Sequence, residues 1–234
     1  MLPRRNSPES LSEFLNYLAK TDCDGGCERI PPLAQLSQQL NISVASLREQ
    51  MEVAKAMGLV EARPRTGIRR LTYTFRPAVV QSLAYALAIN PETFNAYADL
   101  RSHIEAAYWY QAVNLLNEQD HQDLRELITR AFDKLHGQPV QIPHAEHREL
   151  HLAIYKRLNN PFVTGLLEAF WEVYEVFGLD VYSDLAYHER VWDYHARMVE
   201  AICNRNVTVG YDALMEHMDL IYQREKKPVS QAFE

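Results

Sequence analysis

Residues 195–217 have the sequence HARMVEAICNRNVTVGYDALMEH, and this stretch decides the expected fold of the larger part of the chain. It predicts two helices separated by a break at Asn204-Arg205-Asn206, with His195 eleven residues before Asn206 and His217 eleven residues after it. In an antiparallel helical hairpin, arms of equal length bring the two histidines level with each other. Imidazole nitrogen is a good ligand for Zn, Ni and related divalent ions. The stretch therefore predicts a helical bundle with a buried metal site.

A second pair of histidines lies upstream of this hairpin. His147 and His151 are four residues apart, so on a helix both imidazoles leave the same face, one turn from each other. In the alternative reading, the four are simply members of a set of nine scattered histidines that cap helices or face solvent. The mirrored spacing and the paired spacing favour a site. We expect His147, His151, His195 and His217 to hold a divalent metal ion, Zn or Ni.

Composition indicates a globular protein of the reducing cytosol. The chain has 234 residues and only three cysteines, and no stretch approaches eighteen apolar residues, so we expect no membrane span and a cytoplasmic location. Charge is uneven along the chain. Residues 1–75 hold ten Lys and Arg against eight Asp and Glu, whereas residues 76–234 hold fourteen against twenty-three. An acidic body with a slightly basic head is compatible with nucleic acid that contacts only the head.

The pattern of caps, breaks and apolar positions predicts a mainly α protein with two domains. In the head, helices are expected at 7–20, 33–40 and 43–57 and strands at 59–62 and 68–74, which is the order of a winged helix-turn-helix. The remainder predicts an all-α antiparallel bundle with helices at 78–89, 91–116, 118–136, 144–158, 161–179, 184–204 and 207–224. We expect a DNA-binding domain over 1–76, an effector, metal-binding and dimerisation domain over 77–225, and a loose tail over 226–234.

Several motifs resemble a known family. In the head, the resemblance to the DNA-binding domain of GntR-type bacterial regulators is carried by Ile30–Ser37, Leu47–Glu49 and Gly58–Pro64. The bundle resembles the FCD effector domain of the FadR subfamily. That match is carried by Leu100-Arg101-x3-Glu105-Ala106-Ala107, by Leu150-His151 with Asn160, and by His195-x5-Ala201-Ile202 followed by Leu214 and His217.

The resemblance implies a dimeric, ligand-responsive transcription factor whose bundle holds a divalent metal through an Asp and three histidines. The match carries His151, His195 and His217 over directly, but His147 stands where the family usually has Asp. Without a protein anion the ion keeps its full charge, which favours a small carboxylate effector or a softer metal. Alternatively, the site is weakened and His147 is not a ligand.

The resemblance also implies roles for two further residues of the bundle. Arg101 and Asn160 are expected to bind the effector, and Arg101 would face its carboxylate with a bidentate guanidinium. We therefore expect the carboxylate to bridge the metal and Arg101. The alternative for Arg101 is an exposed ion pair with Glu105 at i, i+4.

On the DNA side the chain departs from the family, because Ala34 and Val44 stand where arginines are common. Arg48 remains on the recognition helix, and the wing region is rich in arginine. We expect a DNA operator of atypical sequence to be held by Ser43, Ser46, Arg48, Arg63, Arg65, Arg69 and Arg70. In one alternative the head has lost DNA binding. In another, the chain is a helical metalloenzyme with Glu146 or Glu149 as general base. The winged helix makes a regulator, rather than an enzyme, the expected function.

Overall fold

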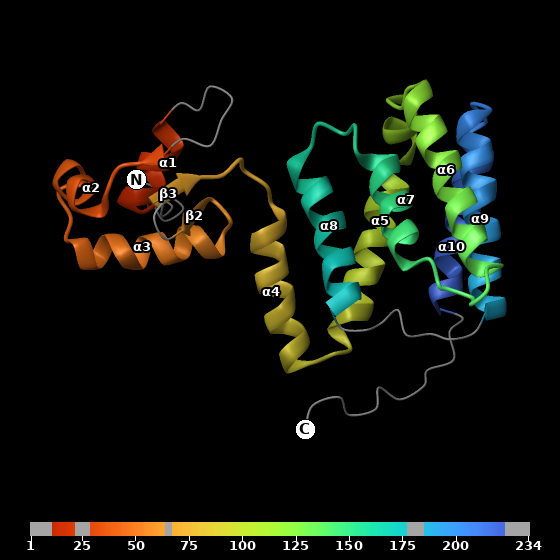
Figure 1. Ribbon diagram of the computed structural model, residues 1–234, viewed down its shortest axis with the longest axis horizontal. Coiled ribbons are helices and arrows are strands. Elements are labelled where there is room, and N and C mark those ends of the chain that lie inside the picture. The colour runs from red at the N-terminus through yellow and green to blue at the C-terminus, as the bar shows by residue number, and fades with distance from the viewer. Residues whose placement is uncertain (1–10, 22–28, 64–66, 177–184, 223–234) are drawn as a thin grey trace, which may run out of the picture. The chain divides into compact units, whose positions relative to one another are not determined.

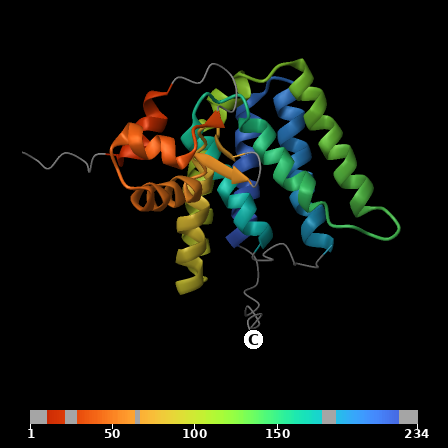
Figure 2. The same cartoon turned by 60° about the vertical axis from the view of Figure 1, so that its left-hand side comes forward.

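The structure, a computed structural model, describes residues 11–21, 29–63, 67–176 and 185–222. The chain divides into two units, Met1–Leu83 and Ala84–Glu234, with the boundary inside helix α4 (Arg76–Ile89). Figure 1 labels the elements of both units, and Figure 2 shows the same ribbon turned. The domain limits expected from the sequence stay a prediction, and the expected tail over 226–234 lies outside the described residues. None of the described helices is both long and apolar enough to cross a membrane.

The first unit has the predicted winged helix-turn-helix order of elements. Its helices and strands are α1 (Glu13–Lys20), β1 (Arg29–Ile30), α2 (Leu33–Leu40), α3 (Val44–Ala56), β2 (Val60–Arg63) and β3 (Gly67–Arg70). Serine side chains begin two of these helices, because Ser12 Oγ accepts from the backbone N–H of Leu15 and Ser43 Oγ from that of Ser46. Asn41 ends α2 in the left-handed conformation, with φ 53°. The fold class expected from the sequence is thus confirmed for the head.

The sheet of this unit contains a strand that the sequence pattern did not predict. Its order is β1-β3-β2, all antiparallel, and Ile30 of β1 lies opposite Ile68 of β3. A strand of two residues is too short to show an alternating pattern, which explains why it was missed. The expected returning strand over 68–74 also ends early, at Arg70. The core beneath the sheet is formed by fully buried Phe14, Leu36 and Leu47 with their neighbours.

The described part of the second unit contains helices only. They are α5 (Thr93–Asn114), α6 (Glu118–Leu135), α7 (His144–Tyr155), α8 (Pro161–Val176), α9 (Leu185–Cys203) and α10 (Val207–Tyr222). Helix α5 packs against α7, α8 and α10, while α9 packs against α6 and α10. In Figure 1 the labelled helices of this unit run alongside one another. The predicted all-α bundle is confirmed.

The predicted helical hairpin is formed by α9 and α10. The chain turns where Arg205 adopts a left-handed φ of 57° and the backbone N–H of Asn206 donates to the carbonyl oxygen of Ala201 at 2.8 Å. The predicted break at 204–206 therefore separates the two helices, and His195 and His217 lie on its two arms.

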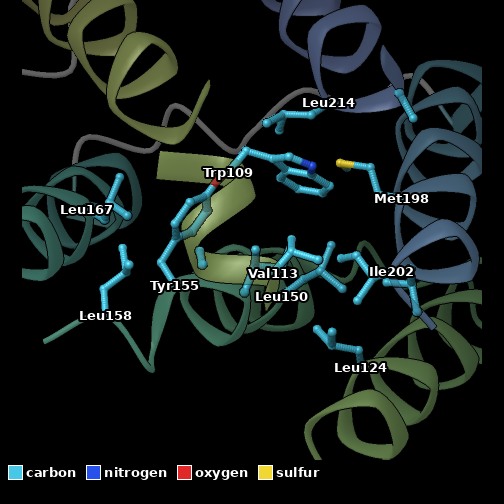
Figure 3. Packing of buried hydrophobic residues seen from close by; sticks show 14 of the residues in the cluster. Trp109, Val113, Leu124, Leu150, Tyr155, Leu158, Leu167, Met198, Ile202 and Leu214 are labelled. Atoms are coloured by element: carbon cyan, nitrogen blue, oxygen red, sulfur yellow. The ribbon is translucent and has the colours of Figure 1, made fainter. Parts of the chain in front are cut away.

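Trp109 of α5 fixes the position of this hairpin. Its fully buried indole lies between Leu214 and Met198 (Figure 3), and its Nε1–H donates to the carbonyl oxygen of Val207 at 2.9 Å. A Cβ at Gly210 would lie 2.7 Å from Cζ2 of the indole, so only glycine allows α10 to approach this closely. The contact holds the first turn of α10 against α5, which sets the position of the helix that carries His217.

Candidate metal centre

The four predicted histidine ligands meet inside the bundle. Helix α7 contributes His147 and His151, α9 contributes His195, and α10 contributes His217. One ring nitrogen from each lies within 4.8 Å of one ring nitrogen from every other. The side chains of His151, His195 and His217 are buried, with at most 2% of the surface of each residue exposed. The packing of three helices has therefore brought together residues 70 positions apart in the sequence.

Three of the ring nitrogens converge at the spacing that a metal ion requires. His195 Nε2 lies 3.2 Å from His151 Nε2 and 3.3 Å from His217 Nε2. Two nitrogens bound to one tetrahedral zinc ion at about 2.0–2.1 Å are themselves about 3.3 Å apart. A neutral imidazole has one donor and one acceptor nitrogen, so hydrogen bonds cannot give all three of these atoms a good partner at once. The donor set fits a single divalent ion held by nitrogen.

The surroundings keep these imidazoles in the form that binds metal. Burial lowers the pKa of His147 and His195 well below the usual value, and neighbouring histidines lower it further. Burial also lowers the pKa of His151, against the opposing effect of Glu105. Neutral imidazole has a free lone pair, whereas imidazolium has none. His147 Nε2 and His195 Nδ1 are buried and have no hydrogen-bond partner among the described residues, which marks a place where a ligand is needed.

The site also contains a carboxylate that the sequence analysis does not place there. Glu105 is fully buried, and its Oε2 lies 3.2 Å from His151 Nδ1. Arg101 Nε and Nη2 donate to the two carboxylate oxygens of Glu105, both at 2.9 Å. The alternative of an exposed Arg101–Glu105 pair is therefore wrong, because the two side chains are only 2% and 0% exposed. The Arg101–Glu105 ion pair does form, but it is buried next to His151.

Glu105 is ionised in this environment. Burial alone would raise its pKa, but the charge of Arg101 and the hydrogen bonds from His151 and Arg101 outweigh burial and hold the pKa at about 2. The guanidinium of Arg101 lies over the rings of Phe170 and Trp171, 4.8 and 5.2 Å from their centroids. Tyr155 adds a third constraint by donating its hydroxyl to the carbonyl oxygen of Glu105 at 2.9 Å. The histidine cluster is therefore flanked by a rigid, nearly neutral ion pair.

Two tryptophans close the site against solvent. The ring of Trp171 lies 4.7 Å from that of His147, and the ring of Trp192 lies 4.8 Å from that of His195. Both indoles are buried, and Trp171 Nε1 has no hydrogen-bond partner among the described residues. Because Trp171 belongs to α8 and aromatic residues recur throughout the helices, no sequence signal distinguishes it from an ordinary core residue.

Comparison with known proteins agrees with this geometry. A match to the FCD domain covers residues 97–220, which include all four histidines. The chain belongs to the FCD domain family. In a comparison with curated proteins, none matches the sequence.

Several solved structures resemble the chain at low sequence identity. Streptococcus agalactiae GntR is 16% identical, with a TM-score of 0.60 over 84% of this chain and 90% of that one. Escherichia coli McbR/YncC is 20% identical with a TM-score of 0.47, over 82% of this chain and 86% of that one. A GntR family member from Pseudomonas syringae pv. tomato is 17% identical with a TM-score of 0.45, over 82% and 74%. The first of these shows that the chain shares the fold of that protein over most of its length.

Asn160 of the FCD domain lies at the start of α8 and not among the histidines. Its Oδ1 accepts from the backbone N–H groups of Phe162 and Val163 at 3.1 and 3.3 Å, and its Nδ2 donates to the Tyr108 hydroxyl at 3.4 Å. It also lines a surface hollow of about 460 Å³ at the junction of α7 and α8. Asn160 therefore acts as a helix cap, and its role in ligand binding stays a prediction.

The two carboxylates considered as general bases both face α6. Glu146 forms an ion pair with Lys134, at 2.7 Å from Oε1 to Nζ, and Glu149 forms one with Arg130 at 2.9 Å. No hydrogen bond in the described part of the chain joins either carboxylate to a histidine of the cluster. In the described structure these two carboxylates are therefore paired with cations of α6 and are not positioned beside the histidines.

The residues expected to bind DNA on α3 differ in their availability. Ser43 caps the helix through Ser46 N–H, at 3.1 Å, and Ser46 Oγ accepts from Gln50 Nε2 at 3.4 Å. Arg48 is exposed one turn further along, and none of the hydrogen bonds or ion pairs among the described residues involves it. Arg48 is therefore the cation of this helix that is free to contact a nucleic acid.

The wing arginines also divide into available and occupied ones. Arg69 is exposed, and Arg63 is exposed but forms an ion pair with Glu61 at 2.9 Å. Arg70 is half-buried, and its Nη1 donates to the carbonyl oxygen of Thr21. Arg65 lies outside the described residues. The unpredicted strand β1 adds Arg29, exposed and directly opposite Arg69, which sequence patterns could not place because its strand was not expected.

Proposed function

We propose that this protein is a ligand-responsive bacterial transcription regulator that binds operator DNA through its winged helix and holds a divalent metal in its FCD domain. The observation that carries the proposal is the four-histidine cluster, three of whose members are buried, in a chain that also has a winged helix-turn-helix. A bacterial transcription regulator binds chromosomal DNA in the cytoplasm, so we propose a cytoplasmic location.

The proposed DNA contacts are the exposed cations of the first unit. Arg48 on α3 would reach base edges in the major groove, while Arg69 and Arg63 of the wing would contact phosphates. Paired helix-turn-helix heads read two half-sites, so we propose that the protein acts as a homodimer on a pseudo-palindromic operator. Because Ala34 and Val44 offer no charge to the DNA, the operator should be atypical for this class of regulator.

The proposed metal ligands are His147, His151, His195 and His217, and Zn or Ni suits this set of borderline nitrogen donors. When bound, the ion would act as a Lewis acid that holds an anionic effector. Four neutral imidazoles leave the charge of the ion uncompensated, and Arg101 and Glu105 nearly cancel each other. A small carboxylate is therefore the proposed effector.

Arg101 can serve the effector and Glu105 at the same time. A guanidinium carries five N–H donors, and the two hydrogen bonds to Glu105 use two of them. A third N–H group, on Nη2, faces His151 Nδ1 at 2.9 Å, so the two N–H groups of Nη1 are the donors left for a carboxylate at the metal. The effector would shift DNA affinity by binding one state of the bundle more tightly than the other.

The proposal is tested by a gel shift with DNA from upstream of the gene, using metal-loaded protein, chelator-treated protein and chelator-treated protein with zinc added back. We expect a salt-sensitive complex whose affinity changes when the metal is removed and returns when zinc is restored. Metal analysis of the purified chain should find about one divalent ion per chain, as a single four-histidine site requires. Absence of binding to any fragment, with metal present, would refute the DNA-binding function and leave the FCD domain as a ligand-binding module.

A further inference from the structure

Within the described cluster, His151 is in contact with the buried Arg101–Glu105 pair. Its Nε2 lies 3.2 Å from His195 Nε2 and 3.3 Å from Arg101 Nη2, whereas its Nδ1 lies 3.2 Å from Glu105 Oε2. We propose that Glu105 positions His151 as a metal ligand by accepting a hydrogen bond from its Nδ1–H. This inference rests on the metal site proposed above and assigns Glu105 a role that the expected ligand set leaves out.

The chemistry of imidazole requires such an acceptor. A histidine that binds metal through Nε2 must keep its lone pair there, so its proton is on Nδ1. In a buried site that proton needs an acceptor, or the free energy of an unpaired donor opposes metal binding. Glu105 Oε2 is the carboxylate oxygen within reach. An ionised acceptor also makes the imidazole a stronger electron donor, as carboxylate–histidine–metal arrangements generally do.

Arg101 gives the same nitrogen a second possible partner. Its Nη2 lies 2.9 Å from His151 Nδ1, and because it is a donor it can pair with Nδ1 only when the proton is on Nε2. In that tautomer Nε2–H would point toward His195 Nε2 and could not bind metal. The Arg101–Glu105 pair therefore satisfies His151 in both tautomers, and a bound ion selects the tautomer in which Glu105 accepts.

Arg101 also holds Glu105 in place. Both carboxylate oxygens are bound by the guanidinium at 2.9 Å, and the side chain is fully buried, so the carboxylate is not free to rotate away from His151. A rigid acceptor fixes the plane of the imidazole and reduces the entropy lost when the ion binds. Glu105 thus acts on the metal through His151, as a positioning residue and not as a ligand.

The first test compares zinc affinity in the full-length protein. Zinc dissociation constants are measured by competition with a chelator for wild type, Glu105→Gln and the control Glu216→Gln. The control removes the charge of a glutamate that also pairs with an arginine, Arg197, but lies on the surface of the same bundle. We expect Glu105→Gln to bind zinc about 10–100-fold more weakly and the control to match wild type. Affinity of Glu105→Gln within about twofold of wild type overturns the inference.

A second measurement separates positioning from a general effect on folding. In zinc-loaded wild type with ¹⁵N-labelled histidine, His151 should carry its metal on Nε2 and a slowly exchanging proton on Nδ1. The resonance is assigned by its loss in His151→Gln. In Glu105→Gln this proton signal should move upfield while the signals of His195 and His217 stay in place.

The wild-type spectrum decides the question even if Glu105→Gln does not fold. Metal on Nδ1 of His151, or a Nδ1 proton that exchanges as fast as one facing water, overturns the inference. The metal site itself fails under a different result, in which wild type binds no zinc at all.

Discussion

The two units of this chain place their charged residues in opposite environments. In the winged helix, Arg48 and Arg69 are exposed, whereas in the FCD domain Arg101 and Glu105 are at most 3% exposed. An exposed charge costs little during folding and is available to a polyanion. A buried charge is costly unless its partner is in place. Substitution of the exposed arginines of the winged helix should therefore change DNA binding alone. Substitution of Arg101 or Glu105 should change the stability of the fold as well.

The largest expected effect is the loss of one partner from the buried pair. Arg101→Ala leaves the Glu105 carboxylate buried beside His151 without its guanidinium, and should lower the free energy of unfolding by about 3–5 kcal/mol. Urea denaturation in the presence of a chelator measures this cost without any contribution from metal.

The matched control is Arg197→Ala, which breaks the Arg197–Glu216 pair. That pair is about half exposed on both sides, so its loss should cost no more than about 1 kcal/mol. Equal costs for the two variants would show that burial does not distinguish the two pairs.

The second effect tests the metal itself. The double variant His195→Ala/His217→Ala should contain no metal, and zinc should no longer raise its melting temperature. In wild type, free zinc at about 100 times its dissociation constant adds about 2.7 kcal/mol of stability. For a unit of this size that corresponds to a shift of about 5–10 °C. Thermal melts with and without zinc, together with metal analysis, provide the measurement.

Two exposed histidines provide the control for this experiment. His103 and His136 have side chains that are 76% and 62% exposed, and removing both should leave the zinc-dependent shift intact. If the double variant of the site keeps a wild-type metal content, the four-histidine assignment is wrong.

The third effect belongs to the head. Arg48→Ala should reduce the preference for the cognate operator by roughly 1–3 kcal/mol, because a base-reading arginine is lost. Arg69→Ala should weaken binding to all sequences and reduce the slope of affinity against salt by about one unit. Arg70→Ala is the control, because its Nη1 is already bound to the Thr21 carbonyl oxygen. Fluorescence anisotropy at several salt concentrations would contradict the assignment if Arg70→Ala changed the salt slope and Arg69→Ala did not.

The smallest effect concerns Asp120, a buried carboxylate whose two cationic partners are partly exposed. Asp120 is 3% exposed, closes the capping box of α6 with Asn117, and pairs with Lys156 and Arg157 after α7, whose side chains are 39% and 40% exposed. Asp120→Asn should therefore cost only about 1–2 kcal/mol, measured as a shift of the urea midpoint at neutral pH.

The pH dependence of this cost follows from the pKa of Asp120. Burial alone would raise that pKa, but the hydrogen bond from Arg157 and its neighbours outweigh burial and hold it below its ordinary value of 3.8. The unfolded chain then takes up the proton at a higher pH than the folded chain. The stabilisation is complete above that ordinary value and is lost as pH falls further. The difference in midpoint between wild type and Asp120→Asn should be constant from pH 7 to about 5 and narrow below about 4; an unchanged difference at pH 3 contradicts this.

Much of the fold could be predicted because its signals are local. The break at 204–206, the serine cap at Ser43 and the apolar stripes each depend on residues within one or two turns of a helix. The strand β1 could not be predicted, because two residues show no period and Ile30 becomes a strand residue only by pairing with Ile68. The convergence of the four histidines could be predicted from spacing and resemblance, because the i, i+4 pair and the mirrored hairpin are geometric consequences of helix periodicity.

The sequence by itself determined the helices of this protein and the histidine side chains that they carry. Only the tertiary structure decided that Arg101 and Glu105 form a buried pair, that Glu105 faces His151, and that Trp171 covers the site. The i, i+4 spacing of Arg101 and Glu105 is the same whether that face of α5 meets water or another helix. Burial arises from the packing of α5 against α7 and α8, which depends on residues far apart in the chain. Burial, in turn, is what makes this ion pair costly to break and able to orient a metal ligand.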